Sequence, residues 1–234
     1  METLRDLICA SGLELTYGLA KFDDSYIPYI YERLRMTPAE SVRMSVHLGA
    51  AFRGLEKQLR PDTLIDPKRL DPEPILRSLV SHGIEFVLIG GIAASARLAP
   101  WASYNLEITP SGSKANIERV ASALKELDAT PPTGEPSGVP FPIDARGLAN
   151  SQIWTMTTPY GDIDCSFVPS GTQGYDDLKR GAGPVEVFPG LVVQVASLSD
   201  VIRSKEAAGR PKDLAVLPLL RQTLEEIHRR EGRT

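Results

Sequence analysis

The sequence has few of the residues that identify several classes of protein. It contains two cysteines (Cys9, Cys165) and three histidines (His47, His82, His228) among 234 residues. Two cysteines are too few for a disulfide framework, and the histidines do not have the spacing of metal ligands. The chain also has no apolar run of about 18 residues, the minimum for a membrane span, and no secretory signal at its N-terminus. We therefore expect a cytoplasmic protein without a membrane partner and without a nucleophilic thiol.

A large excess of charge of one sign is also missing. The net charge is −4, which argues against a surface covered in basic residues for nucleic acid. Hydrophobic residues make up 42% and charged residues 24% of the chain, the composition of an ordinary globular protein. A chain of 234 residues can bury a core as one domain, or as one domain with a helical appendage.

The pattern along the chain predicts three segments. Residues 1–60 are expected to be helical, because Thr37-Pro38-Ala39-Glu40 has the N-cap, first-turn proline and glutamate of a capping box. Residues 61–74 are rich in proline and are expected to be a linker. Residues 75–234 alternate between strand and helix patterns. The expected fold is α/β (α+β), a mixed sheet flanked by helices, behind a helical N-terminal segment.

Apolar periodicity predicts the elements of residues 75–234. Helices are expected at 75–82, 92–98, 114–127, 198–208 and 211–230. Strands are expected up to Ile89, at 104–109, and in two hairpins formed by 151–158 with 162–168 and by 185–188 with 191–195. Residues 130–149 are rich in proline and glycine and are expected to form an irregular loop.

Two neighbouring features of this region point to chemistry. Gly90-Gly91 directly follows a short apolar strand, where paired glycines let the backbone approach a phosphate beside a helix N-terminus. Asn105 and Glu107 stand two apart on the next expected strand, so they should project from the same face, toward the glycines. Two carboxylates in these places would bind Mg²⁺ over a nucleoside triphosphate, but here one of the pair is an amide.

Five motifs in order carry a family resemblance: GGIAA (90–94), PYGDID (159–164), GYDDL (174–178), ASLSDVIRSK (196–205) and GRPKDL (209–214). Over about residues 75–220 the chain resembles the nucleotidyltransferase fold shared with polymerase beta. More narrowly, it is similar to the AbiEii and MenT group of toxin-type nucleotidyltransferases. Gly-Gly alone is a weak signal, and the strength of the resemblance comes from the order of all five motifs.

The resemblance implies a metal triad in which this chain departs from the family pattern. The family has Asp-x-Asp and a later Asp that together bind Mg²⁺; the matching residues here are Asn105, Glu107 and Asp164. The formal charge of the triad falls from −3 to −2, and Mg²⁺ needs near-ideal octahedral oxygen ligands. We therefore expect weakened two-metal binding. Asp162 could compensate, although a place in the hairpin turn is the interpretation we favour.

The resemblance also implies a nucleotide site. Lys205 and Asp213 match family residues on the last two helices, and Arg210 or Lys212 could assist them at the triphosphate beside Gly90 and Gly91. A plain surface salt bridge is the alternative for the helix residues. Ser103 could contact a phosphate, or it could be an ordinary exposed residue at the end of a strand. Trp101 and Tyr104 could stack on a base, although aromatic residues are more often part of the core.

Two functions follow from these expectations, and the sequence leaves both open. The first, implied by the resemblance, is transfer of a nucleoside monophosphate from an NTP to an acceptor, such as the 3′ end of a tRNA or a protein. That function implies Mg²⁺ as cofactor and a toxin–antitoxin setting with a cognate antitoxin. The second is a catalytically degenerate member of the family that binds a nucleotide or a partner protein. A third, less favoured interpretation is a structural module with a helical partner-binding arm.

Overall fold

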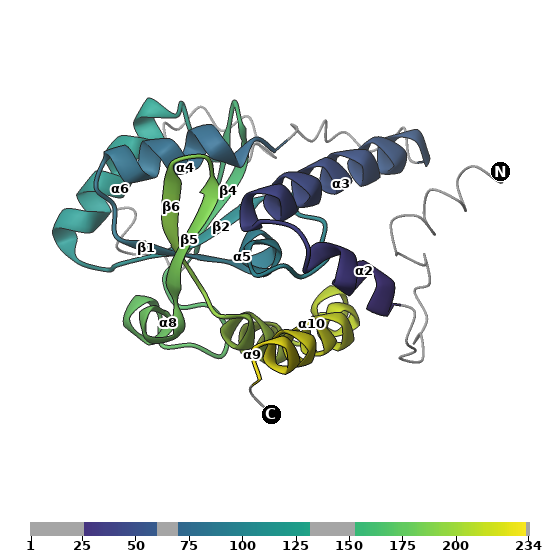
Figure 1. Cartoon of the computed structure of the whole chain (residues 1–234). Coiled ribbons are helices and arrows are strands. Elements are labelled where there is room, and N and C mark those ends of the chain that lie inside the picture. Colours follow the sequence, from purple (N-terminus) through teal and green to yellow (C-terminus); the bar gives the residue numbers. More distant parts are fainter. Residues whose placement is uncertain (1–25, 60–69, 132–152, 233–234) are drawn as a thin grey trace.

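The computed structural model describes residues 26–59, 70–131 and 153–232 of the chain. These residues form a mixed α/β structure in which helices surround one six-stranded sheet (Figure 1). The predicted fold class is therefore confirmed at the level of a mixed sheet flanked by helices. None of the helices in the described residues is long and apolar enough to cross a membrane.

The six strands combine parallel and antiparallel pairs in the order β3-β4-β2-β1-β6-β5. Antiparallel hairpins β3–β4 and β5–β6 form the two sides of the sheet, and both were predicted. In the centre β1 pairs antiparallel with β2, while β2 pairs parallel with β4 and β1 pairs parallel with β6. The strands are β1 (Phe86–Ile89), β2 (Leu106–Pro110), β3 (Ile153–Thr158), β4 (Gly161–Ser166), β5 (Gly183–Phe188) and β6 (Leu191–Val195).

The helices pack around this sheet, with α4 against α6 and α9 against α10 (Figure 1). They are α2 (Ile27–Arg33), α3 (Pro38–Leu59), α4 (Pro72–Ser81), α5 (Gly90–Ala96), α6 (Lys114–Glu126), α8 (Tyr175–Gly181), α9 (Leu198–Ala208) and α10 (Pro211–Arg230). The core lies between sheet and helices; Leu88, Leu106 and Ile163 of three neighbouring strands are completely buried there. The predicted bounds of α9 and α10 are confirmed.

Local sequence signals explain where the helices begin and end. The capping box is confirmed: the backbone N–H of Thr37 donates to Glu40 at 2.7 Å, and the Glu40 N–H donates to the Thr37 hydroxyl at 3.3 Å. Ser197 caps α9 in the same way, accepting from the Asp200 N–H at 3.0 Å. Gly209 ends α9 in a left-handed conformation with φ 62°. The ends of these helices are thus set by short-range chemistry.

The prediction for the start of α4 was wrong by one turn. We expected the proline-rich linker to reach residue 74, but α4 begins at Pro72. A proline in the first turn of a helix loses no hydrogen bond, because its missing N–H would have had no partner there. Residues 1–25 and 60 of the predicted helical segment, residues 61–69 of the predicted linker and most of the predicted loop (132–149) lie outside the described residues.

The N-terminal helix α3 packs directly against the sheet domain. It contacts α5 and β5, and the Ser45 carbonyl accepts a hydrogen bond from the backbone N–H of Ser103 at 3.2 Å. A Cβ on Gly49 would lie 2.0 Å from the Ser103 carbonyl oxygen, so α3 approaches the chain before β2 as closely as a glycine allows. The helix therefore covers the segment that leads into the candidate site.

Candidate functional site

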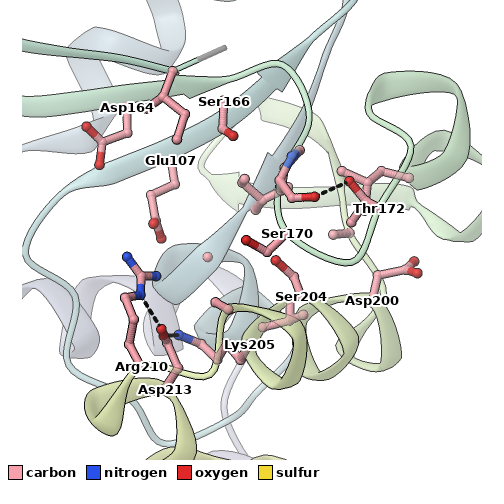
Figure 2. Close-up of a pocket in the computed structure, with 18 of the residues that line it drawn as sticks. Glu107, Asp164, Ser166, Ser170, Thr172, Asp200, Ser204, Lys205, Arg210 and Asp213 are labelled. Atoms are coloured by element: carbon pink, nitrogen blue, oxygen red, sulfur yellow. Dashed lines mark hydrogen bonds and ion pairs between the residues drawn. The ribbon is translucent and has the colours of Figure 1, made fainter.

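A cleft of about 370 Å³ lies between strands β2 and β4 and helices α9 and α10 (Figure 2). Glu107 and Asp164 form its sheet wall, and Lys205, Arg210 and Asp213 form its helix wall. These five residues and Gly90 were named as candidates from the sequence, and most of them belong to its motifs. The cleft therefore brings together candidate residues that are up to 123 positions apart, from Gly90 to Asp213.

The sheet wall follows from the pairing of two parallel strands. Glu107 of β2 and Asp164 of β4 are register partners, so their side chains leave neighbouring strands at the same level. Ile89, the last residue of β1, is the register partner of Glu107 on the other side, which brings the Gly90-Gly91 turn beside the Glu107 carboxylate. The two carboxylates and the glycine turn thus form one continuous polar surface.

Gly90 is required because Glu107 fills the space beside it. Its φ is +66°, and a Cβ built there would lie 1.5 Å from Oε2 of Glu107. The N–H of Gly91 donates to the same Oε2 at 3.2 Å. In this structure the amide that we expected to face a phosphate is therefore occupied by the carboxylate of Glu107.

Several charged groups act on Glu107. Burial raises the pKa of this carboxyl above its ordinary value, and the neighbouring Asp164 raises it further. Lys205, the Gly91 N–H and Lys212 act in the opposite direction but do not cancel the shift in pKa. Proton binding is therefore easier at Glu107 than at an exposed glutamate.

Asn105 lies at a bend just before β2, whereas we expected it within the strand. Its side-chain Nδ2 donates a 2.6 Å hydrogen bond to Oδ2 of Asp164. Asn105 does not line the cleft. We expected Asn105 to be a third metal ligand through its carbonyl oxygen. Instead its N–H group, which cannot bind a cation, points toward the carboxylate of Asp164.

The helix wall is a compact ion cluster centred on Asp213. This carboxylate is only 2% exposed; Oδ1 accepts from Nζ of Lys205 at 3.0 Å, and Oδ2 accepts from Nε of Arg210 at 2.5 Å. Burial acts to raise the pKa of Asp213, but the hydrogen bonds from Arg210 and Lys205 outweigh it and hold this pKa below its ordinary range. Two cations against one anion leave the cluster with a net charge of +1, facing the sheet wall.

Lys205 is held from a second side by Trp101. Its Nζ lies 5.5 Å from the centroid of the indole ring, a cation–π distance. Trp101 is half-buried against the hydrophobic core. Tyr104, the other aromatic candidate, has the guanidinium of Arg53 over its ring at 5.3 Å, and its carbonyl accepts from Arg53 at 2.9 Å. Neither aromatic side chain lines the cleft.

Two further sequence candidates, Ser103 and Asp162, lie outside the cleft lining, although the Ser103 hydroxyl lies beside Gly91. Ser103 is 3% exposed under α3, and its hydroxyl donates a 3.4 Å hydrogen bond to the carbonyl of Asn105. Asp162 accepts a 2.9 Å hydrogen bond from the hydroxyl of Thr157, its register partner in the β3–β4 hairpin. Both side chains have structural partners in these places, and neither belongs to the cleft lining.

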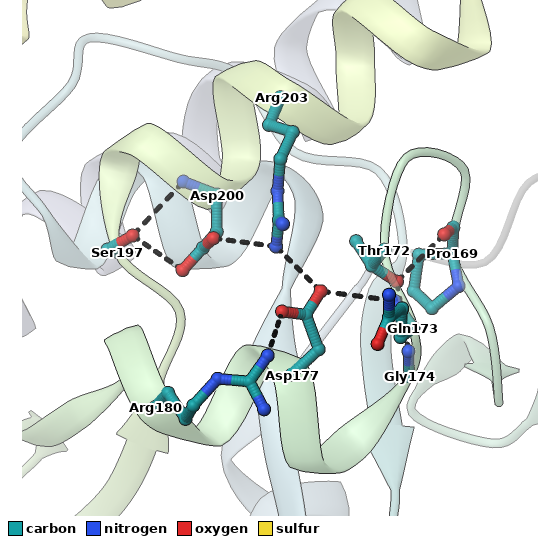
Figure 3. A network of polar contacts seen from close by, with 9 residues as sticks. All are labelled: Pro169, Thr172, Gln173, Gly174, Asp177, Arg180, Ser197, Asp200 and Arg203. Atoms are coloured by element: carbon teal, nitrogen blue, oxygen red, sulfur yellow. Dashed lines mark hydrogen bonds and ion pairs between the residues drawn. The ribbon is translucent and has the colours of Figure 1, made fainter.

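Sequence reasoning did not name the hydroxyl groups of the cleft, which come from the end of β4, the loop that follows it and α9. Ser166, Ser170, Thr172 and Ser204 bring hydroxyl groups to it (Figure 2). Asp177 supports this part, because its carboxylate accepts from the Gln173 N–H at 3.0 Å and from Arg203 at 2.9 Å (Figure 3). The GYDDL and DVIR stretches carry these two charged residues, so the motifs held a signal that was interpreted only as part of the fold.

The resemblance implies Mg²⁺, and the sheet wall fits one such ion better than two. Oδ1 of Asp164 is buried and has no hydrogen-bond partner among the described residues, a costly condition that a cation would relieve. Glu107 supplies a second carboxylate beside it. No group of three or more His, Cys, Asp or Glu residues that could hold a metal ion is found in the described part of the chain. Because Oδ2 of Asp164 is already bonded to Asn105, the carboxylate oxygens left for a cation are Oδ1 of Asp164 and those of Glu107, which suits one ion.

Comparison with known proteins adds no family assignment: no family model and no curated protein matches this chain.

Proposed function

We propose that the cleft binds the triphosphate of an NTP and that the protein transfers the nucleoside monophosphate to an acceptor hydroxyl. The observation that carries this proposal is the opposition of two walls across one cleft, with Glu107 and Asp164 on one side and the cluster of Lys205, Arg210 and Asp213 on the other. Phosphoryl transfer needs this combination, because cations must hold the phosphates while carboxylates hold a metal ion against them.

The helix wall would bind the phosphates. Arg210 is largely exposed, so its guanidinium can turn toward a phosphate, and the partly buried Lys205 supplies an ammonium donor. Asp213 keeps both cations at the cleft, and its lowered pKa keeps it ionised at neutral pH. The net charge of +1 attracts a polyanion without leaving the buried carboxylate unpaired.

The sheet wall would bind the metal. Asp164 and Glu107 would hold one Mg²⁺, and an ion bound there would withdraw negative charge from the phosphate oxygens. The Gly91 N–H, which now binds Glu107, would be released for a phosphate oxygen if that carboxylate turned toward the ion. The acceptor hydroxyl oxygen would form a bond to the α-phosphorus as the bond from that phosphorus to pyrophosphate breaks, and the hydroxyl proton would pass to water.

A second candidate function is nucleotide or partner binding without catalysis. The specific observation in its favour is the Asn105 amide, which donates to Asp164 where the family places a third carboxylate. The two candidates share the helix wall and differ only in what the sheet wall can do. A tRNA 3′ end or a protein as acceptor, and a cognate antitoxin as partner, follow from the toxin resemblance alone and extend either proposal.

The test is transfer of labelled nucleotide. Wild-type protein with Mg²⁺, each labelled NTP and total tRNA should label RNA or protein, and Asp164→Asn should abolish the signal. Asp162→Asn is the matched control, since Asp162 stands on the same strand but outside the cleft. Equal labelling by wild type and Asp164→Asn would contradict the proposed site. Silence of the wild type, with a signal from the Asn105→Asp, Glu107→Asp double variant, would support the binding-only candidate.

A further inference from the structure

The hydrogen bond between Asn105 and Asp164 determines the character of the sheet wall. At 2.6 Å it is short, and its donor is an amide N–H and its acceptor a carboxylate oxygen. An aspartate in place of Asn105 would bring two carboxylate oxygens to about this distance with no proton between them. Like charges this close repel strongly unless a cation lies between them. The amide therefore does for Oδ2 of Asp164 what a metal ion would otherwise do.

Two other carboxylate oxygens of the sheet wall differ in whether they have a hydrogen-bond partner. Oε2 of Glu107 accepts from the Gly91 N–H at 3.2 Å, whereas Oδ1 of Asp164 has no partner among the described residues. One oxygen of Asp164 is thus held by a donor and the other is left for a cation. A side chain that fixes a ligand in this way belongs to the outer sphere of a metal site.

We propose that Asn105 is a positioning residue, whose amide replaces one of two metal ions by holding Oδ2 of Asp164, so that the sheet wall takes a single divalent cation between Asp164 and Glu107. The identity of that cation as nucleotide-bound Mg²⁺ rests on the proposed function, but the role of Asn105 does not. The inference differs from the sequence interpretation, in which Asn105 gives its carbonyl oxygen to the metal.

The experiment compares full-length wild type with Asn105→Asp and Asn105→Ala in chelator and in increasing Mg²⁺, without nucleotide. In chelator we expect Asn105→Asp to melt about 5–10 °C below wild type, from the loss of a charge-assisted hydrogen bond and the gain of a repulsion. Millimolar Mg²⁺ should restore most of that loss. Asn105→Ala should also melt below wild type, by less, and Mg²⁺ should restore little of it, because alanine adds no ligand.

Asp162→Asn serves as the control. Asp162 is on the same strand as Asp164 but outside the cleft, and the change disturbs its 2.9 Å hydrogen bond from Thr157 of β3. The melting temperature of this variant should therefore not depend on Mg²⁺. Calorimetric titration with Mn²⁺ gives a second readout. We expect one ion for wild type and at least tenfold tighter binding for Asn105→Asp.

Three outcomes would overturn the proposal. The first is that Asn105→Asp melts at the same temperature as wild type in chelator, and the second is that wild type binds two ions. The third is that Asn105→Ala binds metal more weakly but melts at the wild-type temperature, which would show that Asn105 is a metal ligand and not a positioning residue. If Asn105→Asp is unfolded in chelator, refolding on addition of Mg²⁺ supports the proposal, and failure to refold contradicts it. None of these readouts involves nucleotide, so a failure of the proposed transfer activity would be seen separately.

Discussion

The two walls of the cleft differ in how far their charges are satisfied within the protein. In the helix wall a buried carboxylate holds two cations, and the cluster keeps a net charge of +1. In the sheet wall two carboxylates leave neighbouring strands side by side, with only neutral donors directly bonded to them. One buried oxygen, Oδ1 of Asp164, remains without a partner among the described residues. The helix wall is therefore complete as it stands, whereas the sheet wall is built to gain from a cation.

The largest effect that we expect comes from the glycine turn of the sheet wall. Gly90→Ala places a methyl group 1.5 Å from Oε2 of Glu107 at φ +66°. The left-handed backbone costs about 1–2 kcal/mol and the forced displacement about 1–3 kcal/mol more, measured as the free energy of unfolding. Gly83→Ala is the matched control, because Gly83 has φ +62° and a methyl group added there would meet nothing within 4 Å, so only the backbone cost applies.

A double-mutant cycle separates the two costs of that change. In a Glu107→Ala background the clash with Oε2 and Cδ is absent and only the 3.1 Å contact with Cβ remains, so Gly90→Ala should cost little more than Gly83→Ala. If Gly90→Ala costs the same in both backgrounds, then Glu107 does not occupy the glycine turn in solution.

A smaller effect is expected at the helix wall. If Lys205 meets the triphosphate, Lys205→Ala should weaken NTP binding by about 1.5–3 kcal/mol, the range for hydrogen bonds to charged groups, while the protein stays folded. Calorimetry with a non-hydrolysable NTP measures this change. Lys125→Ala, on α6 and outside the cleft lining, is the control. If the two variants bind the NTP with equal affinity and have normal melting curves, then the Lys205–Asp213 pair is only a structural salt bridge.

The smallest effect is a difference in pH dependence between the walls. The pKa of Asp213 lies below its ordinary 3.8, so its contribution to stability is present above pH 3.8 and is lost as the pH falls through the lowered pKa. The pKa of Glu107 lies above its ordinary 4.5, so the folded state holds a proton that the unfolded state loses. Stability due to Glu107 therefore falls as the pH rises from 4.5 through the raised pKa.

Urea unfolding of wild type, Glu107→Gln and Asp213→Asn from about pH 3 to pH 8 measures both contributions. Relative to Glu107→Gln, wild type should lose stability as the pH rises; relative to Asp213→Asn, it should gain. Each unit of pKa difference is worth about 1.4 kcal/mol. If the stability difference between wild type and variant changes with pH in the same direction for both variants, the pKa values of Glu107 and Asp213 are not shifted in opposite directions.

Local signals explain which elements could be predicted from the sequence. The bounds of α9 and α10 were correct because a serine cap, a left-handed glycine and a first-turn proline mark them directly. The same kind of signal was misinterpreted at Pro72, where a proline that begins a helix was assigned to a linker. Helix starts that contain proline are ambiguous whenever the preceding segment is also rich in proline.

The candidate residues that the structure places differently depend on contacts between distant segments. Ser103 is buried because α3 lies over it, and no pattern around residue 103 carries that information. The partner of Asn105 follows from the parallel register of β2 with β4, which pairs residues 57 positions apart. Spacing could place Asn105 near a metal site, but it could not show that the amide nitrogen, instead of the oxygen, would face Asp164.

The most direct test of the whole account is calorimetric titration of wild-type protein with a non-hydrolysable NTP in the presence of Mg²⁺. The proposed transfer and the binding of a nucleotide without catalysis both require that the helix wall holds a triphosphate opposite Asp164 and Glu107. We predict saturable binding of one nucleotide per chain, weakened by Lys205→Ala and unchanged by Lys125→Ala. No detectable heat of binding up to millimolar nucleotide, with folded protein, would contradict the assignment of this cleft as a nucleotide site.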